Sequence, residues 1–249
     1  MADPGGKIRL FVAAPLGAGA EVVLDAAQAH YLGNVMRQRP GGRIAVFNGQ
    51  DGEWIAEITA LGRRDGRLVA REPGQPQRMP PDVWLVFAPI KKARTDFIVE
   101  KATELGASRV QPVLTRHTNA ERLRTDRLRA HAIEAAEQCG GTFVPEIAEA
   151  LRLDALLDRW PPARRLLFGD ESGTAPPAPS ALAAAAPGPW AILIGPEGGF
   201  APEEAARLRA MPGVLAVTLG PRILRADTAA VAALTLWQAA LGDWREGGR

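Results

Sequence analysis

The chain has 249 residues, of which 47% are hydrophobic and 23% are charged, a balance that is typical of a folded globular protein and excludes a disordered one. Its 30 Lys and Arg residues against 28 Asp and Glu residues leave a net charge of only +2, so total charge is weak evidence for a nucleic-acid partner. The single cysteine, Cys139, excludes an internal disulfide, and His30, His117 and His131 lack the short spacing of a zinc site, so no metal is expected.

Neither a signal peptide nor a membrane span is expected. The N-terminal sequence MADPGGKIRLF has no charged segment followed by an apolar one. The most apolar late segment, residues 229–241, is short and is interrupted by Thr235 and Gln238. We therefore expect a cytoplasmic protein.

The first 80 or so residues consist of short apolar runs separated by turn signals. Asn48-Gly49 and Asp51-Gly52 lie between two such runs and predict a hairpin, because these residues tolerate a positive φ. One short helix is expected over residues 26–37. The series predicts a small β-barrel, with strands over residues 8–12, 21–24, 43–47, 53–58 and 67–71.

Residues 71–81, REPGQPQRMPP, concentrate prolines, which remove the amide donor that strands and helices need. This segment predicts a linker, and we place the domains at residues 1–74 and 75–249. After it, apolar strands alternate with helices, which favours a mostly parallel sheet covered on both faces. We read residues 169–189, rich in Ala and Pro, as a surface excursion between strands.

The first helix of this second part is expected over residues 91–106. Phe97, Ile98, Ala102 and Leu105 recur at the spacing of one helix face, and Gly106 is placed to end the helix.

Two late apolar runs end in Gly-Pro, in LIGPEGGF (residues 193–200) and LGPRILRADTAA (residues 219–230). Glycines at the carboxyl ends of parallel strands let backbone groups approach a ligand, so the two endings predict one shared pocket. Glu203 and Glu204 follow in the first turn of a helix and would repel a phosphate. The glycine patterns of ATP and NAD sites are missing, which disfavours both. For a single ending of this kind, a tight turn before a helix is the competing interpretation.

Two arginines, Arg222 and Arg225, precede a helix that is apolar nearly all round. Such a helix must be buried by another element or by a second subunit. Capping of this helix explains Asp227 or Thr228 about as well as catalysis does. Capping does not explain the arginines, because arginine rarely precedes a buried helix without an anionic partner.

Several motifs carry a family resemblance. Both Gly-Pro endings, with EKATELG, EQCGG and HYLGNVMR elsewhere in the chain, resemble the ribosomal RNA small subunit methyltransferase E family of the SPOUT superfamily. The resemblance covers nearly the whole chain and implies a PUA-like β-barrel followed by an α/β domain with a C-terminal trefoil knot, a rare exception to unthreaded chains. It also implies a homodimer, S-adenosylmethionine as methyl donor, and methylation at N3 of one uridine in the 16S ribosomal RNA of the small subunit.

The resemblance also implies the residues of the cofactor pocket. A sulfonium cofactor suits a neutral pocket lined by backbone better than a phosphate cradle does. The residues implied are Ile194, Gly195, Glu197, Gly198 and Gly199 from the first ending, and Leu219, Gly220, Ile223, Leu224, Arg225 and Thr228 from the second.

The implied reaction places demands on the residues near the acceptor base. Uracil N3 carries a proton at neutral pH, so a group must accept that proton while a cation stabilises the charge spreading onto O2 and O4. Our hypothesis is that Arg225 supplies the cation and that Glu197 or Asp227 accepts the proton. The in-line placement of the two reactants should supply much of the acceleration.

The chain departs from the family pattern at two places. Ala226-Asp227-Thr228 replaces an expected Thr-Glu-Thr, which puts in doubt a role that needs the longer reach of Glu. Ala201 replaces a common Ser or Thr cap, which should weaken the helix start but not the pocket.

An arginine-rich stretch, residues 115–131, is expected to include a long helix with a basic stripe that could neutralise phosphates. A solvated helix face is the alternative. The residues we predict to contact RNA are Arg37, Arg39, Arg43, Arg116, Arg122, Arg124 and Arg222.

The leading interpretation is an enzyme. An RNA-binding module without catalysis would keep the barrel and the basic stripe but would not bind S-adenosylmethionine. A nucleotide-dependent α/β enzyme is disfavoured by the missing phosphate motifs.

Overall fold

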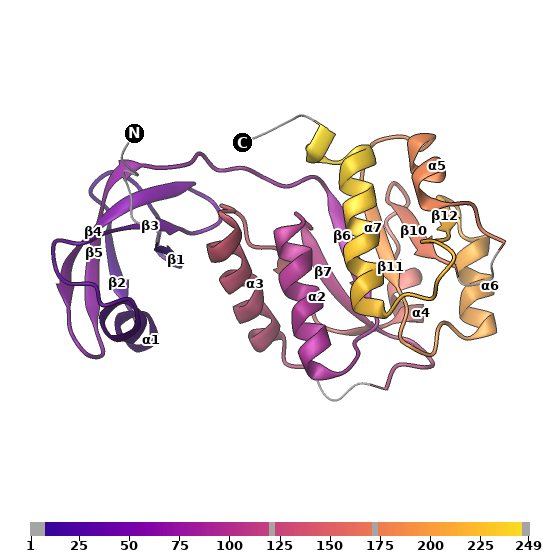
Figure 1. The fold of residues 1–249 in the computed structure, drawn as a ribbon, viewed down its shortest axis with the longest axis horizontal. Helices are drawn as coiled ribbons and strands as arrows, with labels where there is room; N and C mark the ends of the chain where they lie inside the picture. The colour runs from indigo at the N-terminus through magenta and orange to yellow at the C-terminus, as the bar shows by residue number, and fades with distance from the viewer. Residues whose placement is uncertain (1–7, 120–122, 171–173, 246–249) are drawn as a thin grey trace. The chain divides into compact units, whose positions relative to one another are not determined.

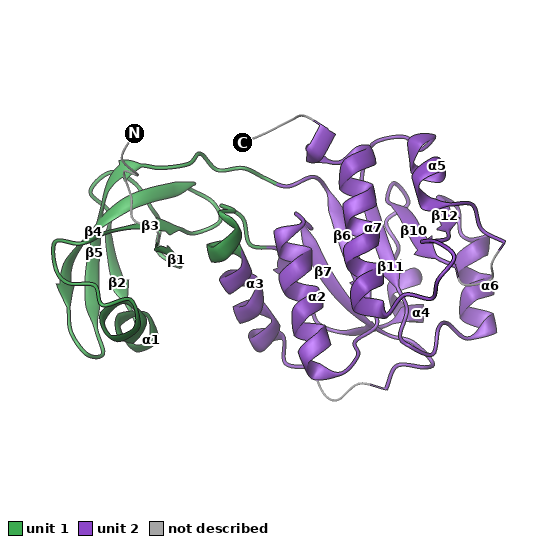
Figure 2. Ribbon diagram, viewed as in Figure 1, with its two compact units in different colours: residues 1–79, 136–144 green, residues 80–135, 145–249 purple. Residues whose placement is uncertain are grey.

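The computed structural model describes residues 8–119, 123–170 and 174–245, which divide into two compact units (Figures 1 and 2). The first unit comprises residues 1–79 and 136–144, and the second comprises residues 80–135 and 145–249. These units are defined by contacts in space, and each consists of two separate stretches of sequence. The domains 1–74 and 75–249 therefore stay a prediction about the chain.

The first unit is built on one five-stranded sheet in the order β1-β3-β4-β5-β2. The parallel pair β1–β3 is the exception among antiparallel pairings. The short apolar runs between turn signals predicted every strand, and the bounds are β1 Arg9–Phe11, β2 Glu21–Leu24, β3 Arg43–Phe47, β4 Glu53–Leu61 and β5 Gly66–Pro73. The predicted hairpin joins β3 to β4, with φ of +84° at Gly49 and +75° at Gly52.

The predicted short helix begins with a capping box. Asp25 accepts a hydrogen bond from the amide of Gln28, whose side chain accepts one from the amide of Asp25. The α-helical part, α1, covers Ala26–His30, and a π-helical segment continues it over Tyr31–Val35.

A segment from far along the chain belongs to the first unit because Arg9 binds it. The Arg9 guanidinium donates to the carbonyl oxygens of Ala136, Glu137 and Gly141 and pairs with Glu53 at 2.7 Å. The donors of this nearly buried side chain are therefore used by carbonyl groups that come about 130 residues later.

The second unit contains a seven-stranded sheet in the order β12-β10-β11-β6-β7-β8, with β9 paired to β7. All of its pairings are parallel, as predicted. Its strands are β6 Val83–Phe87, β7 Arg109–Leu114, β8 Glu146–Ile147, β9 Leu151–Arg152, β10 Arg165–Gly169, β11 Trp190–Ile194 and β12 Val214–Val217. Every residue of the central strand β11 is buried, as expected for a strand covered on both faces.

Helices cover both faces of this sheet. Leu156 of α4 and Leu208 of α6 join one cluster with Val86, while Leu85 and Phe87, which alternate with Val86, are buried on the opposite face. On that opposite side α2 and α7 lie side by side, and α7 packs on β6 and β11 (Figure 1). The helices are α2 Lys92–Glu104, α3 Thr125–Cys139, α4 Leu153–Leu157, α5 Ala178–Ala183, α6 Pro202–Ala210 and α7 Ala226–Leu241.

The predicted apolar face of α2 is partly wrong. Ile98 and Ala102 are buried, but Phe97 is 40% exposed. The buried face instead includes Thr95 and Thr103, whose hydroxyls donate to the backbone carbonyls of Ile90 and Val99 and so can be buried without loss of hydrogen bonds.

The predicted end of α2 is confirmed. Gly106 has a φ of +74°. Its amide donates to the carbonyl of Thr103, and the amide of Ala107 donates to the carbonyl of Ala102, which is the Schellman arrangement.

One further expectation is confirmed and one is corrected. The expected arginine-rich helix is present and begins at Thr125, after a turn that Thr115 and Thr118 close. Residues 169–189 are not merely a surface excursion, since α5 buries Ala178 and Leu182 and Pro177 forms a parallel bridge with Thr218.

Candidate active site

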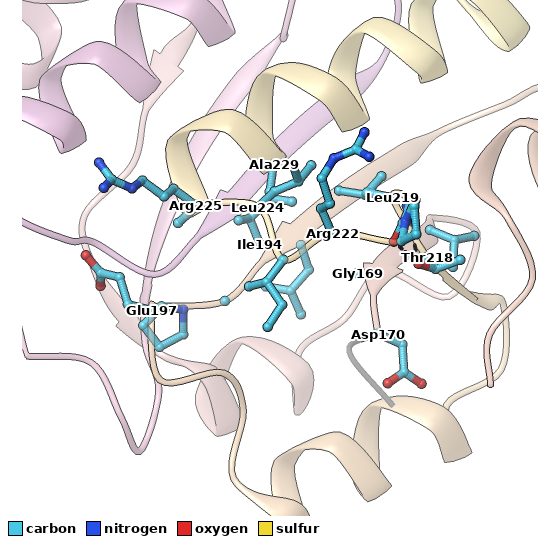
Figure 3. A pocket seen from close by; sticks show the side chains of 18 of the residues that line it. Gly169, Asp170, Ile194, Glu197, Thr218, Leu219, Arg222, Leu224, Arg225 and Ala229 are labelled. Atoms are coloured by element: carbon cyan, nitrogen blue, oxygen red, sulfur yellow. Dashed lines mark hydrogen bonds between the residues drawn. The ribbon is translucent and has the colours of Figure 1, made fainter. Parts of the chain in front are cut away.

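The two Gly-Pro endings meet in one pocket, as predicted. The pocket has a volume of about 770 Å³ and lies beyond the carboxyl ends of β10, β11 and β12 (Figure 3). Its position is the usual ligand site of an open parallel α/β sheet.

Most residues implied for cofactor binding line this pocket, namely Ile194, Gly195, Glu197, Leu219, Gly220, Ile223, Leu224 and Arg225. Gly198, Gly199 and Thr228 are not among the lining residues. Gly198 and Gly199 instead hold the first loop in place, because the Gly198 carbonyl contacts His117 and the Gly199 amide donates to Pro196.

Sequence reasoning missed the wall contributed by β10. Gly169, the last residue of this strand, and Asp170, which follows it, line the pocket together with Pro177. The backbone amide of Asp170 donates to the carbonyl of Val217, which holds the end of β10 beside β12. The one available signal was that an apolar run ends at residue 169, because the carboxyl ends of parallel strands meet at one edge of a sheet.

The missed carboxylate is held by an arginine of α6. Asp170 accepts two hydrogen bonds from Arg209, at 2.8 and 2.9 Å, and its side chain is only 5% exposed. The hydrogen bond to Asp170 raises the pKa of the Arg209 guanidinium above its ordinary value. Both oxygens of Asp170 thus bind Arg209, and the pair adds no net charge beside the pocket.

The first loop, residues 195–200, is held by its own backbone and by aromatic packing. The amide of Gly199, at a φ of +65°, donates to the carbonyl of Pro196 at 2.9 Å. A Cβ on Gly195 would lie 2.8 Å from the ring of Phe200, which packs edge-to-face on Phe168 with ring centroids 5.2 Å apart. This position therefore requires glycine.

The helix after this loop replaces its missing cap with Glu204. The carboxylate of Glu204 accepts from the amide of Ala201 at 3.0 Å with one oxygen and from the amide of Arg116 at 2.8 Å with the other. Half of a capping box is thus present although Ala201 cannot contribute a side-chain oxygen. Glu204 also connects the loop after β7 to the start of α6.

The second loop, residues 219–225, is held more loosely. Thr218 exchanges side-chain hydrogen bonds with the backbone of Gly220, whose φ is +123°. Within the described residues, no backbone-to-backbone hydrogen bond fixes residues 219–224. Ile223 is 93% exposed although it lines the pocket.

Two of the three charged residues predicted for catalysis, Glu197 and Arg225, lie at one end of the pocket. Figure 3 shows Glu197 and Arg225 at this end, Asp170 at the other, and Ile194 with Leu224 between them. Backbone and apolar side chains dominate the middle of the pocket.

Asp227, the third catalytic candidate, does not line the pocket. It lies in the first turn of α7, where one of its oxygens is 3.8 Å from Nη1 of Arg94 and the other accepts from the amide of Thr228. Arg94 comes from the start of α2, and no pattern in the sequence predicts it beside Asp227.

The predicted RNA contacts are dispersed over the two units. Arg37, Arg39 and Arg43 are exposed on the first unit, where Arg43 pairs with Glu72 at 2.8 Å. In the second unit Arg116 is exposed at the tip of a turn and Arg222 lines the pocket.

The other two residues predicted to contact RNA are Arg124 and Arg122. Arg124 pairs with Asp126 at 2.6 Å, and the hydrogen bond from Arg124 lowers the pKa of the Asp126 carboxyl. Arg122 lies outside the described residues.

No group of three or more His, Cys, Asp or Glu side chains could hold a metal ion in residues 8–119, 123–170 and 174–245. Over these same ranges, no helix combines the length and apolar character needed to cross a membrane.

Comparison with known proteins matches both parts of the chain. A sequence model of an RNA methyltransferase domain matches residues 77–238, and one of an RNA methyltransferase PUA domain matches residues 24–69. Fold and pocket thus define an RNA methyltransferase with a PUA domain. The predicted order of a PUA-like domain followed by a parallel α/β methyltransferase domain is confirmed.

The chain belongs to the ribosomal RNA small subunit methyltransferase E family. It is 31% identical to the family member of Synechocystis over 91% of this chain and 75% of the relative. The structure of the Neisseria gonorrhoeae family member bound to S-adenosylmethionine matches with a TM-score of 0.86 and 27% identity, over 95% of this chain and 99% of that one. A Legionella pneumophila methyltransferase in complex with S-adenosylmethionine matches with a TM-score of 0.84 and 28% identity, over 95% and 98%.

Proposed function

We propose that this chain is an S-adenosylmethionine-dependent methyltransferase that methylates N3 of one uridine in 16S ribosomal RNA. The observation that carries the proposal is the single pocket in which both Gly-Pro loops meet, with Glu197 and Arg225 at the same end. Membership of the ribosomal RNA small subunit methyltransferase E family supports the choice of RNA.

The pocket fits S-adenosylmethionine. Its middle is formed by Ile194, Leu219 and Leu224, which suit an adenine ring, and Gly195 and Gly220 leave backbone groups accessible. Its buried carboxylate, Asp170, is already paired with Arg209, so the interior is close to neutral. When bound, the cofactor supplies a methyl carbon made electrophilic by a sulfonium. We propose that Asp170 accepts a hydrogen bond from a donor group of the cofactor.

Arg225 is the proposed cation of the reaction. It is the last residue before α7, it is exposed, and it lines the pocket. The described residues include no ion pair of Arg225, so its charge is available to a uracil whose O2 or O4 gains charge as N3 loses its proton.

Glu197 is the proposed proton acceptor. Both Glu197 and Asp227 stood as candidates, and their surroundings favour Glu197. Glu197 is exposed in the pocket, whereas Asp227 lies outside the lining and faces Arg94. Both carboxylate oxygens of Asp227 already have partners in Arg94 and the amide of Thr228. We therefore assign Asp227 the role of positioning Arg94 at the start of α2.

The RNA is proposed to contact basic residues of both units. Lys91 and Lys92 lie at the start of α2 next to Arg94 and are exposed, and Arg116 is exposed on the turn that contacts Glu204. On the first unit we propose Arg37, Arg39 and Arg43. Such contacts neutralise phosphates and give a steep dependence on salt. Since the proposed substrate is the small ribosomal subunit, the proposed location is the cytoplasm.

We propose that two copies of the chain pair through α7 and the second loop. Val231 and Leu236 of α7 are only half-buried, and Ile223, in the loop that precedes α7, is 93% exposed. Burying these apolar side chains against a second copy would remove them from water. Sedimentation of the Ile223→Ser protein should show a dimer dissociation constant roughly tenfold higher, and a wild-type protein that sediments as a monomer contradicts the pairing. The trefoil knot stays a prediction of the family resemblance.

Methyl transfer tests the function directly. Purified protein is given S-adenosylmethionine with a labelled methyl group and small ribosomal subunits that lack the modification, with free 16S RNA in parallel. Label recovered by mass spectrometry as 3-methyluridine establishes donor, atom and RNA, and the parallel sample shows whether assembly is required. Binding of the cofactor without transfer contradicts the RNA assignment, and absence of binding supports the RNA-binding module instead.

A further inference from the structure

The turn after β7 contacts the loop that carries Glu197. Thr115 and Thr118 close this turn, since the amide of Thr115 donates to Oγ1 of Thr118 at 2.8 Å and the two hydroxyls lie 2.9 Å apart. Arg116 and His117 are thereby fixed at its exposed tip.

Two hydrogen bonds join this tip to the first loop and to the helix that follows it. The amide of Arg116 donates to Glu204 at 2.8 Å, and Nδ1 of His117 lies 3.0 Å from the carbonyl oxygen of Gly198. A carbonyl oxygen only accepts, so Nδ1 of His117 must carry the proton. The side chain of His117 is therefore a donor to the residue directly after Glu197.

Gly198 permits this contact sterically. A Cβ at this position would lie 3.3 Å from Cβ of His117, closer than most such contacts. The turn and the loop thus approach each other as closely as a glycine allows. The opposite side of the loop is fixed by the hydrogen bond from Gly199 to Pro196.

We propose that His117 is a positioning residue for Glu197. By binding the Gly198 carbonyl it fixes the peptide between Gly198 and Gly199, one residue beyond Glu197, and so it restricts where the Glu197 carboxylate lies at the mouth of the pocket. The same bond holds the loop that lines the cofactor pocket. The inference rests on the proposed function for its catalytic consequence, while its structural consequence can be measured on the protein alone.

The structural test is hydrogen exchange of residues 195–200 in the ligand-free protein. The His117→Ala protein should exchange these amides roughly 2- to 10-fold faster, which is the value of one exposed hydrogen bond. Asn places its amide donor at the same distance from the backbone as Nδ1, so His117→Asn should restore the wild-type rate. His117→Asp has the same shape without a donor and should behave like His117→Ala. Unchanged exchange in His117→Ala overturns the proposal, whatever the outcome of the methyl-transfer assay.

A spectroscopic signature accompanies this test. Nitrogen NMR of His117 should show Nδ1 protonated in the neutral ring as well as in the charged one, because the acceptor on Gly198 requires it. A neutral ring protonated only at Nε2 contradicts the contact.

Kinetics separate positioning from RNA binding. His117→Ala should lower kcat for methyl transfer with little change in KM for the small subunit, and His117→Asn should restore kcat. Arg116→Ala, the matched control, keeps the backbone bond to Glu204 but loses a charge, so it should raise KM instead. A rise in KM alone for His117→Ala, not reversed by Asn, would make His117 an RNA contact and overturn the positioning role.

Discussion

The two loops that form the pocket differ in how they are held. The first, residues 195–200, is fixed by a backbone hydrogen bond across Pro196 and Gly199, by the packing of Phe200 on Phe168 and by His117 from another turn. In the second, residues 219–225, contacts with Thr218 are local and Ile223 is 93% exposed. One wall of the pocket is therefore fixed by contacts with other parts of the chain, while the other is held by few such contacts.

The largest expected effect concerns Arg225, which lies on the second loop. Arg225→Ala should lower kcat for methyl transfer roughly 100-fold or more, the usual loss when one charge-stabilising donor is removed. Arg222 lines the same pocket from the same loop and is the matched control. Its replacement by Ala should mainly raise KM for the small subunit, as expected for a phosphate contact. Equal losses of kcat in both variants would show that the loop, and not Arg225, is what matters.

A smaller effect is expected from steric disturbance of the ordered loop. Gly195→Ala places a Cβ 2.8 Å from Phe200, whose ring cannot move freely because it packs on Phe168. We expect a loss of about 1–3 kcal/mol in the free energy of unfolding and weaker cofactor binding. Gly169 also lines the pocket but has open space at its Cβ position, so Gly169→Ala should be close to neutral in thermal denaturation. Equal melting temperatures of both variants would contradict a preformed first loop.

The smallest expected effect lies away from both loops, in the hairpin of the first unit. The amide of Leu16, and then the side chain of Asn48, donate to Asp51 and lower the pKa of its carboxyl. Because the folded pKa lies below the unfolded value of about 3.9, Asp51 stabilises the fold above that pH and loses this contribution as pH falls through the folded pKa. Asp51→Asn should therefore be slightly less stable at pH 7 and equal to wild type near pH 2.

The control for this variant is its affinity for the cofactor, which is proposed to bind at the two loops. Cofactor affinity should be the same in Asp51→Asn and in wild type, since Asp51 belongs to the first unit and the pocket to the second. A changed affinity would mean that the hairpin and the pocket are energetically coupled.

Local patterns were sufficient to predict much of this fold. Short apolar runs between turn signals located the five strands of the first sheet. Gly106 marked the end of α2 because the chain leaves this helix through a positive φ, which glycine adopts readily. The two Gly-Pro endings predicted a shared pocket because parallel strands end at the same edge of their sheet.

Contacts between distant residues could not be predicted in this way. Asp170 lines the pocket from the end of a third strand, which lacks a Gly-Pro ending, and its partner Arg209 comes from a helix. His117 reaches Gly198 across 81 positions. Phe97 was assigned to the wrong face of α2, because Thr95 and Thr103 can occupy buried positions when their hydroxyls donate to backbone carbonyls.

Hydrogen exchange with and without S-adenosylmethionine tests the central claim most directly, that a preformed loop and a loosely held one close a single cofactor pocket. On adding the cofactor, we expect strong slowing of exchange in residues 219–225 and little change in residues 195–200, which are already protected. Slowing confined to other segments, or a larger change in the first loop than in the second, would contradict the account.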